Sequence, residues 1–313
     1  MRINSPYFYL AFFLILNIFN FVDRNLLIAF APQIKSEFNL TNVQWGLLTG
    51  VYFLFFYSVF GIFMGVLGDK FSRMKIAAAG VFLWSLMTAV TGIAKNFSHL
   101  IFARALIGVG ESALTPNAIS MLSDLFKQNQ RGTASAIYYL GIPLGVGFGM
   151  LIAAFFGPIF GWRAVFIFLG LIGMGLGILT YFLFEPIRGQ LDINFDKTSK
   201  PNSIKDILSM TKSALYNSKC LTFVIIGSIF LHIPLGAGNF EVLWAVNERG
   251  FTASSYNSLF GFLFIIGGTV GALAGGILSD RLSHYFKGGV MTFLVISLSL
   301  IHISEPTRPN FIS

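Results

Sequence analysis

The sequence predicts an all-α protein that crosses a membrane several times, and two observations support this prediction. First, 55% of the 313 residues are hydrophobic and 11% are charged, which is too apolar for a soluble chain of this length. Second, the apolar residues gather in long runs, and a helix of about 20 such residues spans the hydrocarbon core of a bilayer.

Taken in order, these runs predict eight complete spans and the start of a ninth. The ninth begins near Gly288. The first run is too long for a signal peptide and lacks a small-residue cleavage site, so we expect it to remain in the protein. The eight expected spans are 7–31, 45–67, 76–94, 100–122, 132–156, 163–184, 221–246 and 255–279.

Basic residues outside these spans predict the orientation. Fourteen Lys and Arg residues lie on the side of the N-terminus and four on the opposite side, and such residues are retained in the cytoplasm. We therefore expect a multi-pass protein of the cell (inner or plasma) membrane with a cytoplasmic N-terminus. The same residues account for the net charge of +8 without nucleic acid as a partner.

One long polar loop separates the sixth and seventh spans. Within it, "PNSIKDILSMTKSALY" places apolar residues from Ile204 to Leu215 on one helical face, which predicts a short amphipathic helix on the inner membrane surface. A plain linker and a regulatory element both fit this pattern.

An internal repeat predicts two halves. The second span ends in "GVLGDKFSRMK" from Gly65 and the eighth ends in "GILSDRLSHYF" from Gly276. Asp69 and Asp280 correspond, so the offset is 280 − 69 = 211 residues. Two homologous bundles of six helices explain such a repeat, and the second bundle would end near 186 + 211 = 397.

The chain is therefore expected to be truncated at its C-terminus. Its tail, "IHISEPTRPNFIS", looks like translated sequencing-adapter sequence, although a genuine short protein with a polar tail is the alternative. The expected parts are an N-terminal six-helix bundle (1–186), a cytoplasmic linker (187–219), a partial C-terminal bundle with helices 7, 8 and part of 9 (220–301), and a non-native tail (302–313).

"GDKFSRMK" after the second span resembles the loop motif of the major facilitator superfamily. More narrowly, the sequence is similar to the spinster-like branch, whose members include lipid and sphingolipid exporters, over roughly residues 6–300. The segments that carry this resemblance are "NFVDRNLL", "FARALIGVGESALTPNAISMLSDLF", "QRGTASAIYYLGIPLGVGFG", "GWRAVFIFLG" and "EPIRG". A sugar-acid and organic-anion symporter branch shares the charged residues of the first and fourth spans and remains the alternative.

Polar residues form a stripe along each of three spans, at helical spacing. The resemblance implies that the first, fourth and seventh helices line a central cavity, together with a tenth. Simple locking of helices by ion pairs is the alternative reading of each stripe. The candidate residues are Asn17, Asn20, Asp23 and Arg24 in the first span, Arg104, Glu111 and Thr115 in the fourth, and His232 and Asn239 in the seventh.

The rise of a helix predicts which charges meet. Asp23 lies about 24 Å from the inner end of its helix and Arg104 about 6 Å from the outer end, which is the same depth in a core about 30 Å thick. We therefore expect Asp23 to pair with Arg104, and Arg24 to meet an anionic group. Glu111 lies about 10 Å deeper with no partner as close. The resemblance implies that Asp23 and Glu111 serve proton coupling.

Glycine spacing predicts helix packing. We expect Gly141, Gly145 and Gly149 in the fifth span to face Gly267, Gly271 and Gly275 in the eighth across the interface between the halves. An inner-surface charge network is expected to latch one conformation, with a topology determinant as the alternative. Its candidate residues are Gly65, Asp69, Lys70, Arg73, Asp124, Arg131, Asp280 and Arg281.

Several function classes lack their motifs. There is no G-x-x-x-x-G-K-[ST] for an ATP-driven pump and no H-E-x-x-H or G-x-S-x-G for an intramembrane enzyme. The single cysteine, Cys220, gives no metal-site spacing. We expect a monomeric, proton-coupled secondary transporter, not an enzyme, that needs no cofactor beyond the proton gradient. Its expected partners are membrane lipids and an amphipathic or anionic small molecule such as a lysolipid.

Overall fold

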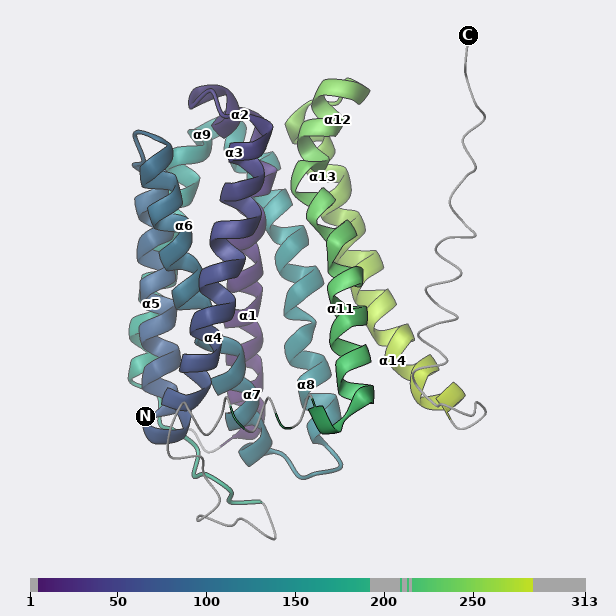
Figure 1. Ribbon diagram of the computed structural model, residues 1–313. Coiled ribbons are helices and arrows are strands. Elements are labelled where there is room, and N and C mark those ends of the chain that lie inside the picture. The colour runs from purple at the N-terminus through teal and green to yellow at the C-terminus, as the bar shows by residue number, and fades with distance from the viewer. Residues whose placement is uncertain (1–4, 192–208, 210–212, 214–215, 284–313) are drawn as a thin grey trace. The chain divides into compact units, whose positions relative to one another are not determined.

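The structure, a computed structural model, describes residues 5–191, 209, 213 and 216–283 (Figure 1). The chain divides into two compact units, residues 1–265 and 266–313. In the first unit, α1 packs against α7, α8 and α9, and α9 also packs against α5 and α13. The described part of the second unit is α14 (Thr269–Ser283) and the end of the π-turn η3 (Phe264–Gly268).

The first unit contains the following elements: α1 (Pro6–Ala29), α2 (Ala31–Glu37), α3 (Asn42–Gly46), the π-turn η1 (Leu47–Val51), α4 (Tyr52–Lys70), α5 (Arg73–Gly92), α6 (Phe97–Glu111), α7 (Leu114–Leu125), α8 (Arg131–Tyr139), α9 (Gly141–Tyr181), α11 (Lys219–Ala237), the 3₁₀ turn η2 (Gly238–Phe240), α12 (Glu241–Arg249) and α13 (Ala253–Leu263).

Side-chain caps mark where several helices start. Thr41 and Gln44 form a capping box at α3, and Ser72 and Asn96 accept backbone N–H bonds at the starts of α5 and α6. Thr252 does the same at α13. Such caps satisfy N–H groups that have no partner within the helix.

The predicted fold class is confirmed. Among the described residues, six helical stretches are long and apolar enough to cross a membrane: Pro6–Ala29, Asn42–Lys70, Arg73–Gly92, Phe97–Leu125, Arg131–Tyr181 and Ala253–Leu278. The longest holds the predicted fifth and sixth spans. Gly161 breaks it with φ 76° and ψ 159°, a backbone conformation that glycine adopts without strain. The seventh span contains a shorter apolar helix, Leu221–Phe230.

Other expectations lie outside the described residues. These are nearly all of the amphipathic helix at 203–215, the ninth span from Gly288 and the tail 302–313. They stay predictions, as does the division of the chain into two bundles.

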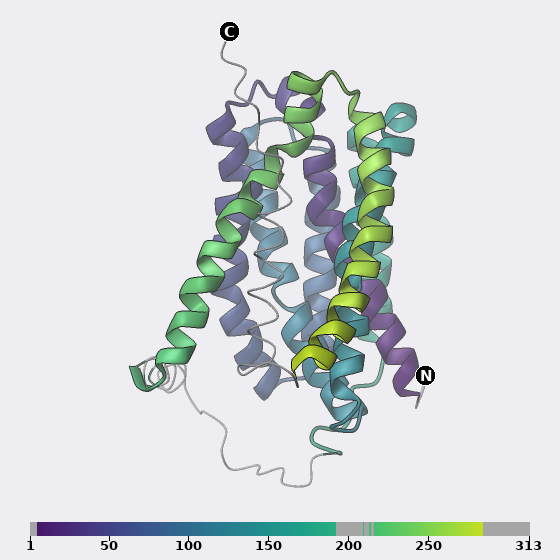
Figure 2. The ribbon, with the colours of Figure 1, turned by 90° about the vertical axis from the view of Figure 1, so that its right-hand side faces the viewer.

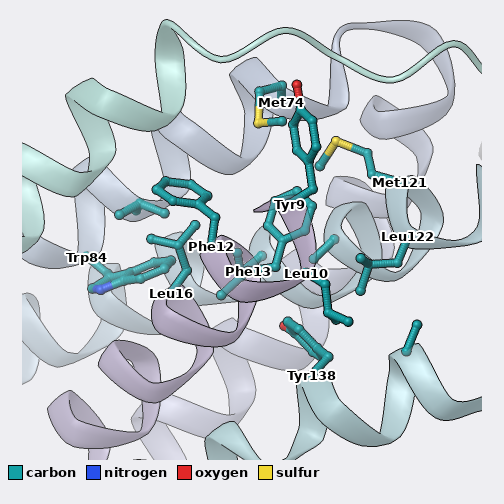
Figure 3. Close-up of a cluster of buried hydrophobic side chains, with 14 of the residues drawn as sticks. Tyr9, Leu10, Phe12, Phe13, Leu16, Met74, Trp84, Met121, Leu122 and Tyr138 are labelled. Carbon is teal, nitrogen blue, oxygen red and sulfur yellow. The ribbon is translucent and has the colours of Figure 1, made fainter. Parts of the chain in front are cut away.

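Helix α1 packs against α7, α8 and α9. Figure 3 shows its N-terminal half, where Phe13 and Leu16 share a buried cluster with Trp84 of α5 and Tyr138 of α8. Each of these four side chains is 1% exposed or less. Because lipid is as apolar as these side chains, close packing rather than removal from water stabilises this core. This packing places the polar stripe of α1 inside protein.

The structure corrects the predicted glycine interface. A Cβ added at Gly145 would lie 2.5 Å from the Phe21 Cβ, and Gly141 and Gly149 likewise abut α1. These glycines therefore let α9 approach α1, while the predicted packing of the fifth span against the eighth is present between α9 and α13. The contact with α13 uses Gly147, where a Cβ would lie 2.6 Å from the Gly261 carbonyl oxygen. Gly267, Gly271 and Gly275 belong to the second unit, and their packing stays a prediction.

Candidate functional site

An ion pair joins the first and fourth spans. Arg24 Nε of α1 lies 2.5 Å from Glu111 Oε2 at the end of α6, and the side chains are 21% and 0% exposed. This corrects the prediction that Glu111 lacks a close partner. The depth estimate compared positions along helix axes, whereas the long arginine side chain reaches across from α1 to α6.

Aromatic rings surround this pair. The Arg24 guanidinium lies 4.9 Å from the ring centres of Phe21 and Phe53 and 4.6 Å from that of Tyr57. The Arg104 guanidinium lies 4.4 Å from the ring centre of Phe53. Both arginines therefore share the π-face of Phe53, an arrangement that favours the cation. Sequence reasoning missed these rings because nothing distinguishes them among the 36 phenylalanines and 10 tyrosines.

Arg104 has no carboxylate partner among the described residues. It is 5% exposed, and its Nε makes no hydrogen bond. The predicted Asp23–Arg104 ion pair is therefore wrong. A buried arginine without a bound anion is costly inside a membrane span.

Asp23 faces another helix. Thr88 Oγ1 of α5 donates a 2.5 Å hydrogen bond to its Oδ2. Adjacent residues of a helix point about 100° apart, so Asp23 faces α5 while Arg24 faces Glu111. The polar residues of the first span therefore contact two different helices, Asp23 contacting α5 and Arg24 contacting α6. Ser85, Thr88 and Thr91 recur every three residues in an apolar span, a signal that sequence reasoning could have used.

Two of the remaining polar residues, Asn17 and Thr115, lie near Tyr138. Asn17 Nδ2 donates to the Tyr138 carbonyl oxygen at 2.8 Å, and Thr115 Oγ1 lies 3.1 Å from the Tyr138 hydroxyl. Asn20 is 3% exposed and its Nδ2 makes no hydrogen bond. Tyr138 is therefore a shared neighbour of Asn17 and Thr115 that the sequence did not indicate.

The seventh-span candidates lie apart from the charged pair. His232 is exposed on α11, with Nδ1 2.7 Å from the Ser228 carbonyl oxygen. Asn239 lies in η2, and its carbonyl oxygen accepts a 2.9 Å bond from Trp45 Nε1. Neither residue has a hydrogen bond to Arg24, Arg104 or Glu111 in the described part of the chain. Their substrate-binding role stays a prediction.

Arg73 organises the inner-surface network. It lies 2.5 Å from Asp124, as the predicted latch requires, and 2.9 Å from Glu185. Burial by itself would raise the pKa of Glu185, but hydrogen bonds from Ser72 and Arg73 hold that pKa below its usual value.

The segment after the sixth span completes this network. Arg188 donates to the Asp69 carbonyl oxygen at 2.6 Å, and the Gly189 N–H donates to Asp124 at 2.9 Å. Sequence reasoning used "EPIRG" only as a resemblance and missed these contacts.

The remaining latch candidates lie around this network or on α14, and their gating role stays a prediction. Lys70 and Arg281 are exposed, Arg131 Nε donates to the Phe126 carbonyl oxygen at 3.2 Å, and a Cβ added at Gly65 would meet no atom within 4 Å. The side chain of Asp280 lies outside the described set, so its gating role stays a prediction.

Residues 219–265 are joined to the N-terminal helices near the predicted outer end. Asn257 Nδ2 donates to the Ala29 carbonyl oxygen at 2.9 Å, and Ser254 Oγ donates to that of Ala154 at 2.8 Å. By contrast, α11 is exposed from Phe223 to Phe230. Figure 2 shows α11 leaning away from its neighbours towards its start at Lys219.

Comparisons with known proteins bear on this arrangement. The sequence matches the model of the Major Facilitator Superfamily over residues 13–312. Relatives named spinster recur in Drosophila melanogaster, Danio rerio and Homo sapiens. The chain spans about half the length of the curated relatives it matches, 46% and 56% for the first two.

Two further relatives, named for different substrates, and one solved structure are also similar to this chain. The sphingosine-1-phosphate transporter of Danio rerio is 32% identical over 56% of this chain and 36% of that protein. The probable L-galactonate transporter of Escherichia coli is 26% identical over 87% of this chain and 60% of that protein. A bacterial homolog to the human lysosomal transporter Spinster, solved in an inward-facing and unoccupied conformation, has a TM-score of 0.76 at 24% identity and covers 91% of this chain and 64% of its own.

Proposed function

We propose that this chain, which belongs to the Major Facilitator Superfamily, forms the proton- and anion-binding half of a secondary transporter. The observation that carries the proposal is the Arg24–Glu111 pair beside Arg104, which has no carboxylate partner among the described residues. A transported anion would supply the direct ion-pair contact that Arg104 lacks.

Competition for Arg24 would couple this anion to protons. While Glu111 is ionised, it neutralises Arg24 at 2.5 Å. A proton on Glu111 removes that charge and leaves two guanidinium groups for one anion. Proton and anion would then bind together. Each proton that crosses the membrane contributes about 2.3 kcal/mol per 100 mV, enough for a roughly fortyfold gradient.

The rings beside the arginines favour an amphipathic substrate. Phe21, Phe53 and Tyr57 place apolar surface next to two cations. A lysolipid combines an anionic headgroup with an apolar chain, and the Danio rerio relative is named for a phosphorylated lipid of this kind. The second candidate is a sugar-acid symporter, favoured by the similarity to the Escherichia coli protein.

The contacts near the predicted outer end support an alternating-access cycle. Asn257 and Ser254 bond to the N-terminal helices there, while α11 is exposed further along. We propose that this is an inward-open state of a monomer in the cell membrane, with the N-terminus in the cytoplasm. The outward-open state would break the Asn257 and Ser254 bonds, and the network around Arg73 would latch one of the two states.

Replacement of Glu111 tests the coupling. In proteoliposomes that carry the full-length gene product, Glu111→Gln should abolish uptake driven by a proton gradient, because glutamine cannot exchange a proton. It should leave exchange of labelled substrate, because the loaded carrier still reorients. Glu248→Gln, an exposed carboxylate on α12, is the matched control. Proton-driven uptake at the wild-type rate in Glu111→Gln would refute the assignment.

Substrate class is tested in the same vesicles. Counterflow of labelled lysolipid, absent for a sugar acid, would support the first candidate, and the reverse would support the second. Channels show no counterflow, so its absence for every anion would remove the carrier proposal itself. Arg104→Gln should weaken binding of whichever anion is transported, whereas Arg249→Gln, exposed on α12, should not.

A further inference from the structure

A small cavity lies beside Asp23, away from the Arg24–Glu111 pair. Its volume is about 10 Å³, and it is bordered by α1, α5 and the second half of α9. Asp23, Ser85 and Thr88 supply its polar lining, while Phe19 and Trp84 supply apolar walls. A cavity of this volume has room for about one water molecule.

Two buried polar atoms beside this cavity make no hydrogen bond. They are Asp23 Oδ1 and Ser85 Oγ, and their residues are 5% and 2% exposed. A buried oxygen without a partner costs about 1–3 kcal/mol, and more when it is charged. Since Asp23 and Ser85 both line this water-sized cavity, a single molecule that bonds to both oxygens would satisfy them together.

We infer that this cavity binds one water molecule, which donates to Asp23 Oδ1 and bonds to Ser85 Oγ. A metal cation fits less well. Hard cations such as Ca²⁺ take about six to eight oxygen ligands, whereas only Asp23, Ser85 and Thr88 present side-chain oxygens here. Water needs about two to four polar partners, which this lining provides.

The water makes Ser85 a positioning residue for Asp23. Thr88 holds Oδ2 directly at 2.5 Å, and Ser85 holds Oδ1 through the water. Together they fix the carboxyl from α5. Gly173 of α9 packs against this site, because a Cβ there would collide with Ser85 Oγ. Any role of this positioned Asp23 carboxyl in proton coupling rests on the proposed function. The water site itself does not depend on that function.

Infrared spectroscopy of the reconstituted chain tests the site. An isolated buried water gives a sharp O–H stretching band that shifts in H₂¹⁸O. We expect this band in the wild-type protein and its loss in Asp23→Asn and Ser85→Ala. Thr91→Val is the matched control, because it removes a buried hydroxyl from the same helix whose Oγ1 bonds to the Met87 carbonyl oxygen instead. It should keep the band.

Other outcomes would overturn the inference. A wild-type spectrum with no such band would do so, and this measurement requires no variant to fold. Persistence of the band in both Ser85→Ala and Gly173→Ala would place the water elsewhere. A band that changes when sodium is replaced by choline would indicate a cation. If the band behaves as expected while Glu111→Gln retains proton-driven uptake, the water site stands and the coupling proposal fails.

Discussion

Two ion pairs of similar geometry and different burial allow a controlled measurement. Arg24–Glu111 and Arg163–Glu37 have N–O distances of 2.5 and 2.6 Å. The side chains are 21% and 0% exposed in the first pair and 35% and 43% in the second. Opposite charges about 4 Å apart interact by about 4 kcal/mol at an effective dielectric constant near 20, and by about 1 kcal/mol in water.

The surroundings refine these values. The rings around Arg24 hold its guanidinium in place, so less side-chain entropy opposes the buried pair. We therefore expect a coupling free energy of roughly 2–4 kcal/mol for Arg24–Glu111. The exposed pair should show about 0.2–1 kcal/mol, the range typical of surface pairs.

A double-mutant cycle for each pair, with glutamine at each position, measures these values. Unfolding would be followed in detergent by tryptophan fluorescence. The cycle also cancels the loss of the Trp162 Nε1 bond to Glu37 in the single mutant. Equal coupling in the two pairs, or stronger coupling in the exposed one, would show that burial does not set the strength of the Arg24–Glu111 interaction.

Three further predictions concern packing, pH and completeness. Gly145→Ala, whose Cβ would lie 2.5 Å from the Phe21 Cβ, should destabilise the protein by about 1–3 kcal/mol. The control Gly175→Ala, whose Cβ would have no atom within 4 Å, should unfold at or above the wild-type temperature. An equal loss of stability in both variants would contradict the packing argument. Hydrogen bonds from Arg163 lower the pKa of Glu37, so its stabilisation is present above the unfolded pKa of about 4.3 and is lost as pH falls through the folded value; a melting series should show this loss, and Arg163→Gln should remove it. This chain reconstituted alone should show no saturable substrate flux, and robust flux would refute the two-bundle interpretation.

The sequence by itself determined the membrane-spanning helices and the buried charges. In lipid a chain must satisfy its backbone hydrogen bonds internally, so each long apolar run has only the helix available to it. A charge within such a run must face protein or water. Asp23, Arg104 and Glu111 are accordingly 5% exposed or less, as the polar stripes predicted.

Only the tertiary structure decided which groups meet. Helix rise placed Asp23 and Arg104 at one depth, but a contact also depends on the rotation of each helix about its axis and on side-chain reach. These follow from the packing of all the helices at once. As a result of this packing, Asp23 bonds to Thr88 and Glu111 pairs with Arg24. The face of α9 that carries Gly145 packs against α1. The repeat of Ser85, Thr88 and Thr91 marks a polar face on α5, but the choice of partner for each group depends on residues from spans that are distant in the sequence.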